Sequence, residues 1–220
     1  MELSFKLKLV DLNPQLCEEF KIAFANYPEV EIINSRFETV EWDCIVSAAN
    51  SFGLMDGGID GAITAYFGKQ MMDRVQQHII KEYAGEQPIG TSFIVEGTDP
   101  NIYAKKKFVA HTPTMRIPMD VSHTDNVYRA MKAMLLAVNK HNEDIKNINI
   151  GPYETKLIQD LKGIHVVACC GLGTLAGRVP YKQAALQMAK AYRHVTNPPT
   201  EITWDYAVNR NLDIIQWKRG

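Results

Sequence analysis

Short apolar runs alternate along the chain with longer stretches in which apolar positions recur at helical spacing. The short runs predict strands, and the longer stretches predict amphipathic helices. Asn13 followed by Pro14 is typical of a helix start, and Gly68 predicts a break inside one long helical stretch. The expected strands are residues 3–10, 30–34, 44–48, 91–96, 107–112 and 165–169, and the expected helices are residues 14 to about 26, 59 to about 83, 125 to about 142 and 181–194. This alternation predicts an α/β fold, a three-layer α/β/α sandwich with a mixed, mostly parallel central sheet.

The pattern shows no internal repeat and no change of composition, which predicts one domain over residues 1–220. Its core is expected over about residues 3–194. Residues 195–220 contain a Pro-Pro break and a short amphipathic pattern at Ile202, Tyr206 and Ile214. We expect this C-terminal accessory segment to pack as a helix.

The charge balance argues against a protein that binds nucleic acid or anionic membranes through a general positive charge, because the formal net charge is −1 and the pI is about 6.6. No apolar run reaches the length of a membrane span or a signal region, so we expect a cytoplasmic protein with no membrane partner. The cysteines show no CxxC spacing and the histidines no HExxH motif, so neither a metal nor another cofactor is expected. The basic run at residues 105–107 is expected to flank a solvated turn.

Residues 43–63, DCIVSAANSFGLMDGGIDGAI, are the most informative about function. An apolar strand ends at Asn50, glycines follow, and Asp60 falls where a helix is expected to begin. Glycines allow close backbone approach, so the loop N–H groups and the helix N-terminus together suit a phosphate or a diphosphate. The chain has no GxxxxGK[ST] motif, and no GxGxxG motif closes this strand.

A second loop of the same kind lies at residues 165–180, HVVACCGLGTLAGRVP. It again joins an apolar strand to glycines and then to a helix. Loops that follow parallel strands lie at the carboxyl edge of the sheet, where open α/β sheets bind their ligands. We therefore expect the two loops to hold one diphosphate from both sides.

These residues resemble the macrodomain family, whose members bind ADP-ribose and related metabolites. The resemblance implies the Appr-1″-p processing type, and we expect a stand-alone member like those known in bacteria and phages. VSAANSFGLMDGGIDGAI is similar to the family's NAAN…GGG[VI]xxAI loop, GLGTLAGRVP to its later phosphate loop, and FVAHTPTM to the strand between them. The resemblance covers about residues 3–194 and implies ADP-ribose or an ADP-ribosylated substrate as the ligand. It implies ligand contacts from Ala48, Ala49, Asp56, Gly57, Gly58 and Ile59 in the first loop, and from Gly171, Gly173, Thr174, Leu175, Ala176, Gly177 and Arg178 in the second.

Hydrolases of this family share an Asn and an Asp ten positions apart, and Asn50 and Asp60 have that separation. The resemblance implies that Asn50 orients the distal ribose and that Asp60 positions or activates a water, assisted by the substrate phosphate. The implied reaction is hydrolysis of a mono-ADP-ribosyl-protein or O-acetyl-ADP-ribose linkage. Two other functions stay open: a module that binds ADP-ribose or a cyclic NAD-derived nucleotide without turnover, and an ADP-ribose 1″-phosphate phosphatase.

Four positions depart from the family pattern. Ser47 stands where the family often has its first Asn, and Asp56 replaces a glycine of the glycine run. Leu175 occupies a usual glycine position, and Ala176 falls near where many relatives carry an aromatic residue on the distal ribose. An extra carboxylate beside a phosphate repels it unless the side chain turns away.

The contact to the adenine amino group is open between two residues. Relatives use an Asp before the first loop, and strict counting along NSRFETVEWD reaches Arg36. A shift of two positions reaches Glu38, which carries the required carboxylate. We take Glu38 as the expected contact.

Overall fold

In the computed structural model, which describes residues 2–98, 106–148, 151, 153–156 and 162–215, six strands form one sheet in the order β2-β1-β6-β3-β5-β4. The antiparallel pair is β4 with β5, and the other neighbouring pairs of these strands are parallel. This arrangement confirms the mixed, mostly parallel sheet. The strands are β1 (Lys6–Asp11), β2 (Glu31–Asn34), β3 (Cys44–Asn50), β4 (Phe93–Thr98), β5 (Lys106–Met115) and β6 (Val166–Cys169).

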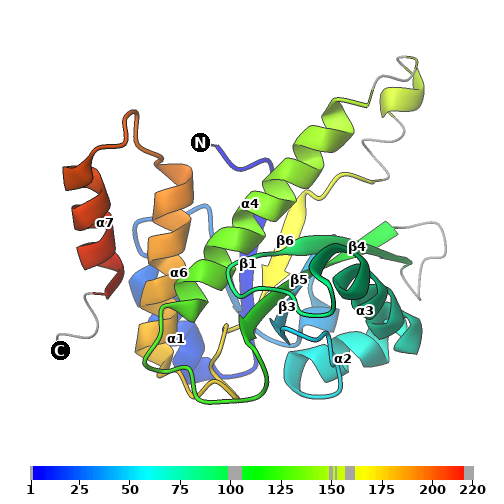
Figure 1. Ribbon diagram of the computed structural model, residues 1–220, viewed down its shortest axis with the longest axis horizontal. Helices are drawn as coiled ribbons and strands as arrows, with labels where there is room; N and C mark the ends of the chain where they lie inside the picture. Colours follow the sequence, from blue (N-terminus) through cyan, green and yellow to red (C-terminus); the bar gives the residue numbers. More distant parts are fainter. Residues whose placement is uncertain (1, 99–105, 149–150, 152, 157–161, 216–220) are drawn as a thin grey trace.

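Helices cover both faces of the sheet, which confirms the three-layer sandwich (Figure 1). One apolar cluster joins the sheet to the first helical layer and contains Phe20 and Met131, and the other joins it to the second layer and contains Trp42 and Ile63. Burial of a large apolar side chain contributes roughly 1.5–3 kcal/mol, so these two clusters hold the layers together. The first layer consists of α1 (Pro14–Ala23), α4 (Asn126–Lys146) and α6 (Tyr181–Thr196), and the second of α2 (Gly58–Phe67) and α3 (Lys69–Tyr83).

The long helical stretch after β3 is divided at Gly68, as the sequence predicts. The N–H of Gly68 donates to the carbonyl of Thr64 and closes α2, and its φ of +85° turns the chain into α3. A Cβ at this position would lie 2.6 Å from Oε1 of Gln70. Only glycine adopts this conformation without strain.

The accessory segment forms a helix, α7 (Trp204–Ile215), which lies beyond α6 (Figure 1). Asp213 of α7 forms ion pairs with Lys190 and Arg193 of α6 and contacts Nε2 of His194 at 2.9 Å, and Ile214 packs against the core. Ile202 is 79% exposed, so the expected packing of this residue is wrong.

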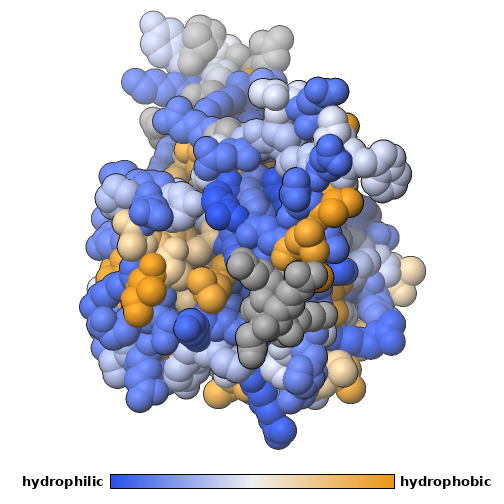
Figure 2. All heavy atoms as spheres, turned by 90° about the vertical axis from the view of Figure 1, so that its left-hand side faces the viewer, coloured by the Kyte–Doolittle hydropathy of each residue, from blue (hydrophilic) through white to orange (hydrophobic). Residues whose placement is uncertain are grey.

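Seen from the side of α7, the molecule shows separate apolar patches among polar side chains (Figure 2). Neither α7 nor any other helix among the described residues has the length and apolar character of a membrane span.

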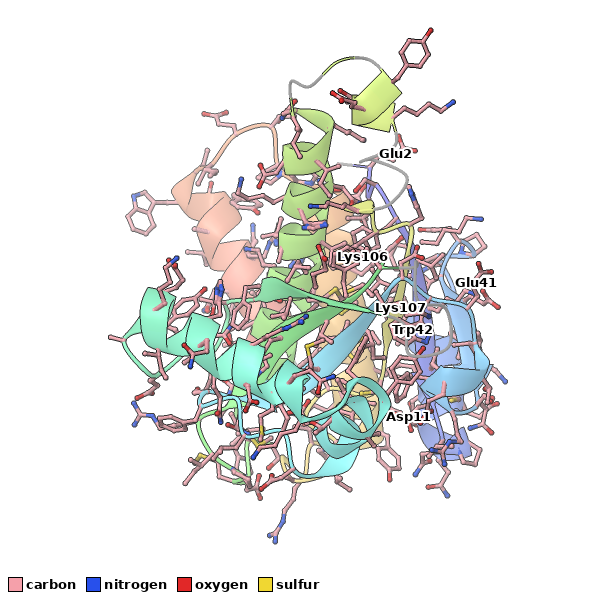
Figure 3. All side chains as sticks on the ribbon, turned by 90° about the vertical axis from the view of Figure 1, so that its right-hand side faces the viewer. Glu2, Asp11, Glu41, Trp42, Lys106 and Lys107 are labelled. Atoms are coloured by element: carbon pink, nitrogen blue, oxygen red, sulfur yellow. The ribbon has the colours of Figure 1, made fainter. Side chains whose placement is uncertain are left out.

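Lys107 is buried, which corrects the expectation of a solvated basic flank. Its Nζ lies 3.6 Å from the centroid of the Trp42 ring and donates to the Trp42 carbonyl at 2.9 Å. A cation held over an indole ring is stabilised by the ring's quadrupole. Lys106 pairs with Glu96, and Lys105 lies outside the described residues. Figure 3 shows Lys106 and Lys107 well separated from Asp11.

Three neighbouring parallel strands, β1, β6 and β3, end at the same edge of the sheet. Their last residues are Asp11, Cys169 and Asn50. The two glycine-bearing loops follow β3 and β6, so the fold brings them together at this carboxyl edge. This is the place that the sequence predicts for a ligand site.

Candidate functional site

The side chain of Asn50 organises the loop that follows β3. Its Oδ1 accepts hydrogen bonds from the N–H groups of Phe52 at 3.0 Å and Leu54 at 3.3 Å, and its Nδ2 donates to the Leu54 carbonyl at 2.8 Å. These bonds fix the plane of the amide. They use one of the two N–H bonds of Nδ2, so the other can serve a ligand.

Asp60 lies in the first turn of α2 and is 5% exposed. The hydroxyl of Ser47 donates to its Oδ1 at 2.5 Å. Burial raises the pKa of Asp60 to about 7, the hydrogen bond from Ser47 opposes the rise, and the charge of Asp56 adds to it. Near neutral pH the carboxyl is therefore present in both protonation states, as a general base requires.

The loop after β6 is fixed by backbone contacts. The N–H of Gly171 donates to Oδ2 of Asp11 at 3.0 Å, which ties the loop to the end of β1. Gly173 has a φ of +68°, and its carbonyl accepts the N–H of Val179 at 3.1 Å. A Cβ on Gly177 would lie only 2.4 Å from the same carbonyl oxygen. The loop therefore requires glycine at position 177 for close packing of its own backbone.

The two loops enclose a cavity of about 610 Å³, a size typical of a small-molecule site. Leu175 of the second loop reaches over the first, because its Cδ2 lies 3.3 Å from where a Cβ of Gly58 would stand. Gly58 and Tyr181, in the first turns of α2 and α6, contribute to the wall. Two helix N-termini with unpaired N–H groups make this part of the cavity suitable for an anion.

The sequence model of the Macro domain matches residues 46–188, which include both loops. The chain belongs to the Macro domain family. It is similar to a protein of Aquifex aeolicus (strain VF5), described as an uncharacterized protein, with 28% identity over 165 residues that cover 75% of this chain and 81% of the relative. The structure is similar to the macrodomain of Mycobacterium tuberculosis DarG, with 16% identity and a TM-score of 0.51 over 73% of this chain and 88% of that one. An Oceanobacillus iheyensis macrodomain solved with ADPR has 15% identity and a TM-score of 0.40 over 71% of this chain and 88% of that one.

In this Macro domain, most residues expected to contact a ligand line this cavity. Gly177 and Arg178 do not: Gly177 is buried behind the loop, and Arg178 is exposed with a φ of +52°. Their expected ligand contacts stay predictions, and the structure gives Gly177 a part in shaping the loop. The lining includes Glu38, Ala48, Ala49, Asn50, Asp56, Gly57, Gly58, Ile59, Asp60, Gly171, Gly173, Thr174, Leu175 and Ala176.

Both candidates for the adenine contact line the cavity, and they bind each other. Nη2 of Arg36 donates to Oε1 of Glu38 at 2.9 Å. Phe37 between them is buried and packs against Trp42, with ring centroids 5.7 Å apart. The Macro domain thus presents a paired donor and acceptor at this end instead of a lone carboxylate.

Sequence reasoning missed several residues of the lining, among them Asp11, Asn13, Cys170 and Tyr181. Oδ1 of Asn13 caps α1, and its Nδ2 donates to the Tyr181 hydroxyl at 2.8 Å. Since that oxygen accepts a hydrogen bond, its own proton is available to an acceptor in the cavity. The sequence signal that could have found them is their position: Asp11 ends a parallel strand, and Tyr181 begins the helix after a glycine loop.

Proposed function

We propose that this protein binds ADP-ribose, or a molecule that contains it, and hydrolyses an ADP-ribosyl linkage at the distal ribose. The observation that carries the proposal is that Asn50 and Asp60 face one cavity walled by two glycine loops. Membership in the Macro domain family supports ADP-ribose binding. In this proposal the loops and the helix N-termini bind the diphosphate. Glu38, which is paired with Arg36, accepts a hydrogen bond from the adenine amino group.

Asn50 and Asp60 would have different parts in the reaction. The remaining N–H of Asn50 holds a hydroxyl of the distal ribose, and the ionised Asp60 accepts a proton from water, which the substrate phosphate helps to hold. On an ADP-ribosylated protein, the water oxygen bonds to C1″ of the ribose while the bond from C1″ to the acceptor breaks, and the acceptor leaves with that electron pair. On O-acetyl-ADP-ribose, the water oxygen bonds to the acetyl carbonyl carbon, and the ribose oxygen leaves with the electron pair of the broken ester bond. Because only the ionised carboxylate can accept this proton, kcat should rise with pH through the Asp60 pKa of about 7.

The burial of Asp60 favours a second candidate, a module that binds ADP-ribose without turnover. The carboxyl is 5% exposed and already accepts the Ser47 hydrogen bond. The test is to incubate the protein with mono-ADP-ribosylated protein, O-acetyl-ADP-ribose and ADP-ribose 1″-phosphate, and to follow the products by mass spectrometry. Release of ADP-ribose from either of the first two supports the hydrolase. Binding without any product supports the module, and turnover of the third substrate alone supports a phosphatase.

Replacing Tyr181 with Phe should lower the affinity for ADP-ribose roughly fivefold, because one hydrogen bond contributes about 1 kcal/mol. Tyr192→Phe is the matched control, since Tyr192 lies on the same helix and its hydroxyl bonds to Glu29 at 2.8 Å, outside the cavity lining. Calorimetric titration of both variants measures the difference. An equal change in affinity in the two variants would show that the Tyr181 hydroxyl has no part in binding.

A further inference from the structure

Ser47 is a fully buried polar residue whose position next to Asp60 is set by the sheet. It lies on β3, which is held between β5 and β6, and its exposed fraction is 0%. Its hydroxyl donates to Oδ1 of Asp60 at 2.5 Å. This short bond connects a rigid central strand to the first turn of α2. An oxygen–oxygen separation of this size is typical of a hydroxyl that donates to an ionised carboxylate.

The same bond decides which oxygen of Asp60 meets a ligand. Asp60 lines the cavity, whereas Ser47 does not. With Oδ1 bound to Ser47, Oδ2 is the oxygen left for a water or a ribose hydroxyl. A hydrogen bond to one oxygen therefore orients the other.

We propose that Ser47 is a positioning residue for the hydrolysis, holding Asp60 ionised and turning its Oδ2 toward the water. This inference rests on the proposed hydrolase function. It adds that the fold sets the ionisation and the orientation of the general base Asp60 through Ser47. Ser47 touches no reacting atom.

The other groups around Asp60 do not replace this hydroxyl. Asp56, on the loop before α2, is a like charge that raises the pKa of Asp60. Cys170, directly after β6, has a thiol pKa raised by burial, so it stays neutral. Among the described residues, the Ser47 hydrogen bond is the one side-chain interaction that lowers the pKa of Asp60. Loss of the hydroxyl should therefore favour the protonated carboxyl.

The test compares Ser47→Ala and Ser47→Cys, which remove the strong donor, with Ser47→Thr, which keeps it. In wild type and each variant, the Asp60 carboxyl is titrated by carbon-13 NMR, with Asp60→Asn used to assign its signal. In the Ala and Cys variants the midpoint should move up by about one pH unit. Hydrolysis at pH 7 should then fall about fivefold in kcat with KM unchanged, and should return to within about twofold of wild type at pH 9. The Thr variant should keep the wild-type profile.

The two readouts separate this inference from the function beneath it. An unchanged Asp60 midpoint in both Ser47→Ala and Ser47→Cys would overturn the role of Ser47, even if the protein hydrolyses its substrate. A shifted midpoint in a protein without turnover would overturn the hydrolase and the role of Ser47 in it, leaving only the coupling between the two side chains. Equal loss of kcat at every pH in all three variants would indicate a structural role and would also overturn the inference.

Discussion

Asp60→Asn is expected to lower hydrolysis of the ADP-ribosyl linkage by about 10²–10⁴-fold while ADP-ribose still binds, because the amide keeps the size of the side chain and cannot accept the water proton. Single-turnover assays and calorimetry on the same preparation measure both quantities. Asp73→Asn is the matched control, since Asp73 is an exposed carboxylate of α3 outside the cavity lining and should keep turnover. Comparable losses in the two variants would contradict a special part for Asp60.

The same variant should be more stable than wild type at alkaline pH, which excludes unfolding as the reason for lost activity. The pKa of Asp60 is about 7 in the folded protein and 3.8 in the unfolded chain. Between these two pH values the folded protein therefore binds the proton more tightly than the unfolded chain does. The favourable contribution of the neutral carboxyl is complete below pH 3.8 and is lost as the pH rises to about 7. At 1.36 kcal/mol per pKa unit, the advantage of Asp60→Asn in unfolding free energy should grow by about 2–3 kcal/mol between pH 5 and pH 8. An advantage that does not change with pH would show that Asp60 is not buried as an acid with a raised pKa.

Gly177→Ala should disrupt the second loop and abolish tight binding of ADP-ribose. The new Cβ would lie 2.4 Å from the Gly173 carbonyl oxygen and 2.9 Å from Cγ2 of Val121, so the backbone itself must move. Overpacking of this kind costs about 1–3 kcal/mol of unfolding free energy. Urea unfolding measures that loss of stability. Calorimetric titration measures the loss of affinity, which should exceed tenfold if the loop moves; a tenfold loss corresponds to about 1.4 kcal/mol of binding free energy.

Gly57→Ala is the control for stability, because a Cβ at position 57 meets nothing within 4 Å. Its φ of −146° is an ordinary extended conformation, so its unfolding free energy should stay within about 0.5 kcal/mol of wild type. Wild-type affinity in Gly177→Ala would show that the close packing of the second loop is not needed for the ligand.

The sequence predicted the layers of the fold because the local signals agree with the tertiary structure. Asn13 and Pro14 start α1, and Gly68 divides α2 from α3. The position of Asp60 beside this loop was also predictable, because β3 ends at Asn50 and α2 begins at Gly58. Glycines before a helix are a local pattern, and local patterns can be read from sequence.

The contacts that the sequence did not predict join residues far apart in the chain. The hydrogen bond between Asn13 and Tyr181 and the link from Asp11 to Gly171 depend on β1 and β6 being neighbours. Lys107 is buried because β3 and β5 are neighbours, which places its Nζ over the ring of Trp42. The basic residues beside it in the sequence predict a solvated flank instead. Such pairings follow from strand order, and a single sequence does not contain strand order as a local signal.

The measurement that tests the account most directly is calorimetric titration of the purified protein with ADP-ribose, beside AMP, ATP and NAD. The account predicts saturable binding of ADP-ribose at one site, tighter than that of the other three, since the cavity of about 610 Å³ combines a diphosphate cradle with Asn50 and Asp60 at the distal ribose. No binding of ADP-ribose, or equal binding of all four nucleotides, would contradict it.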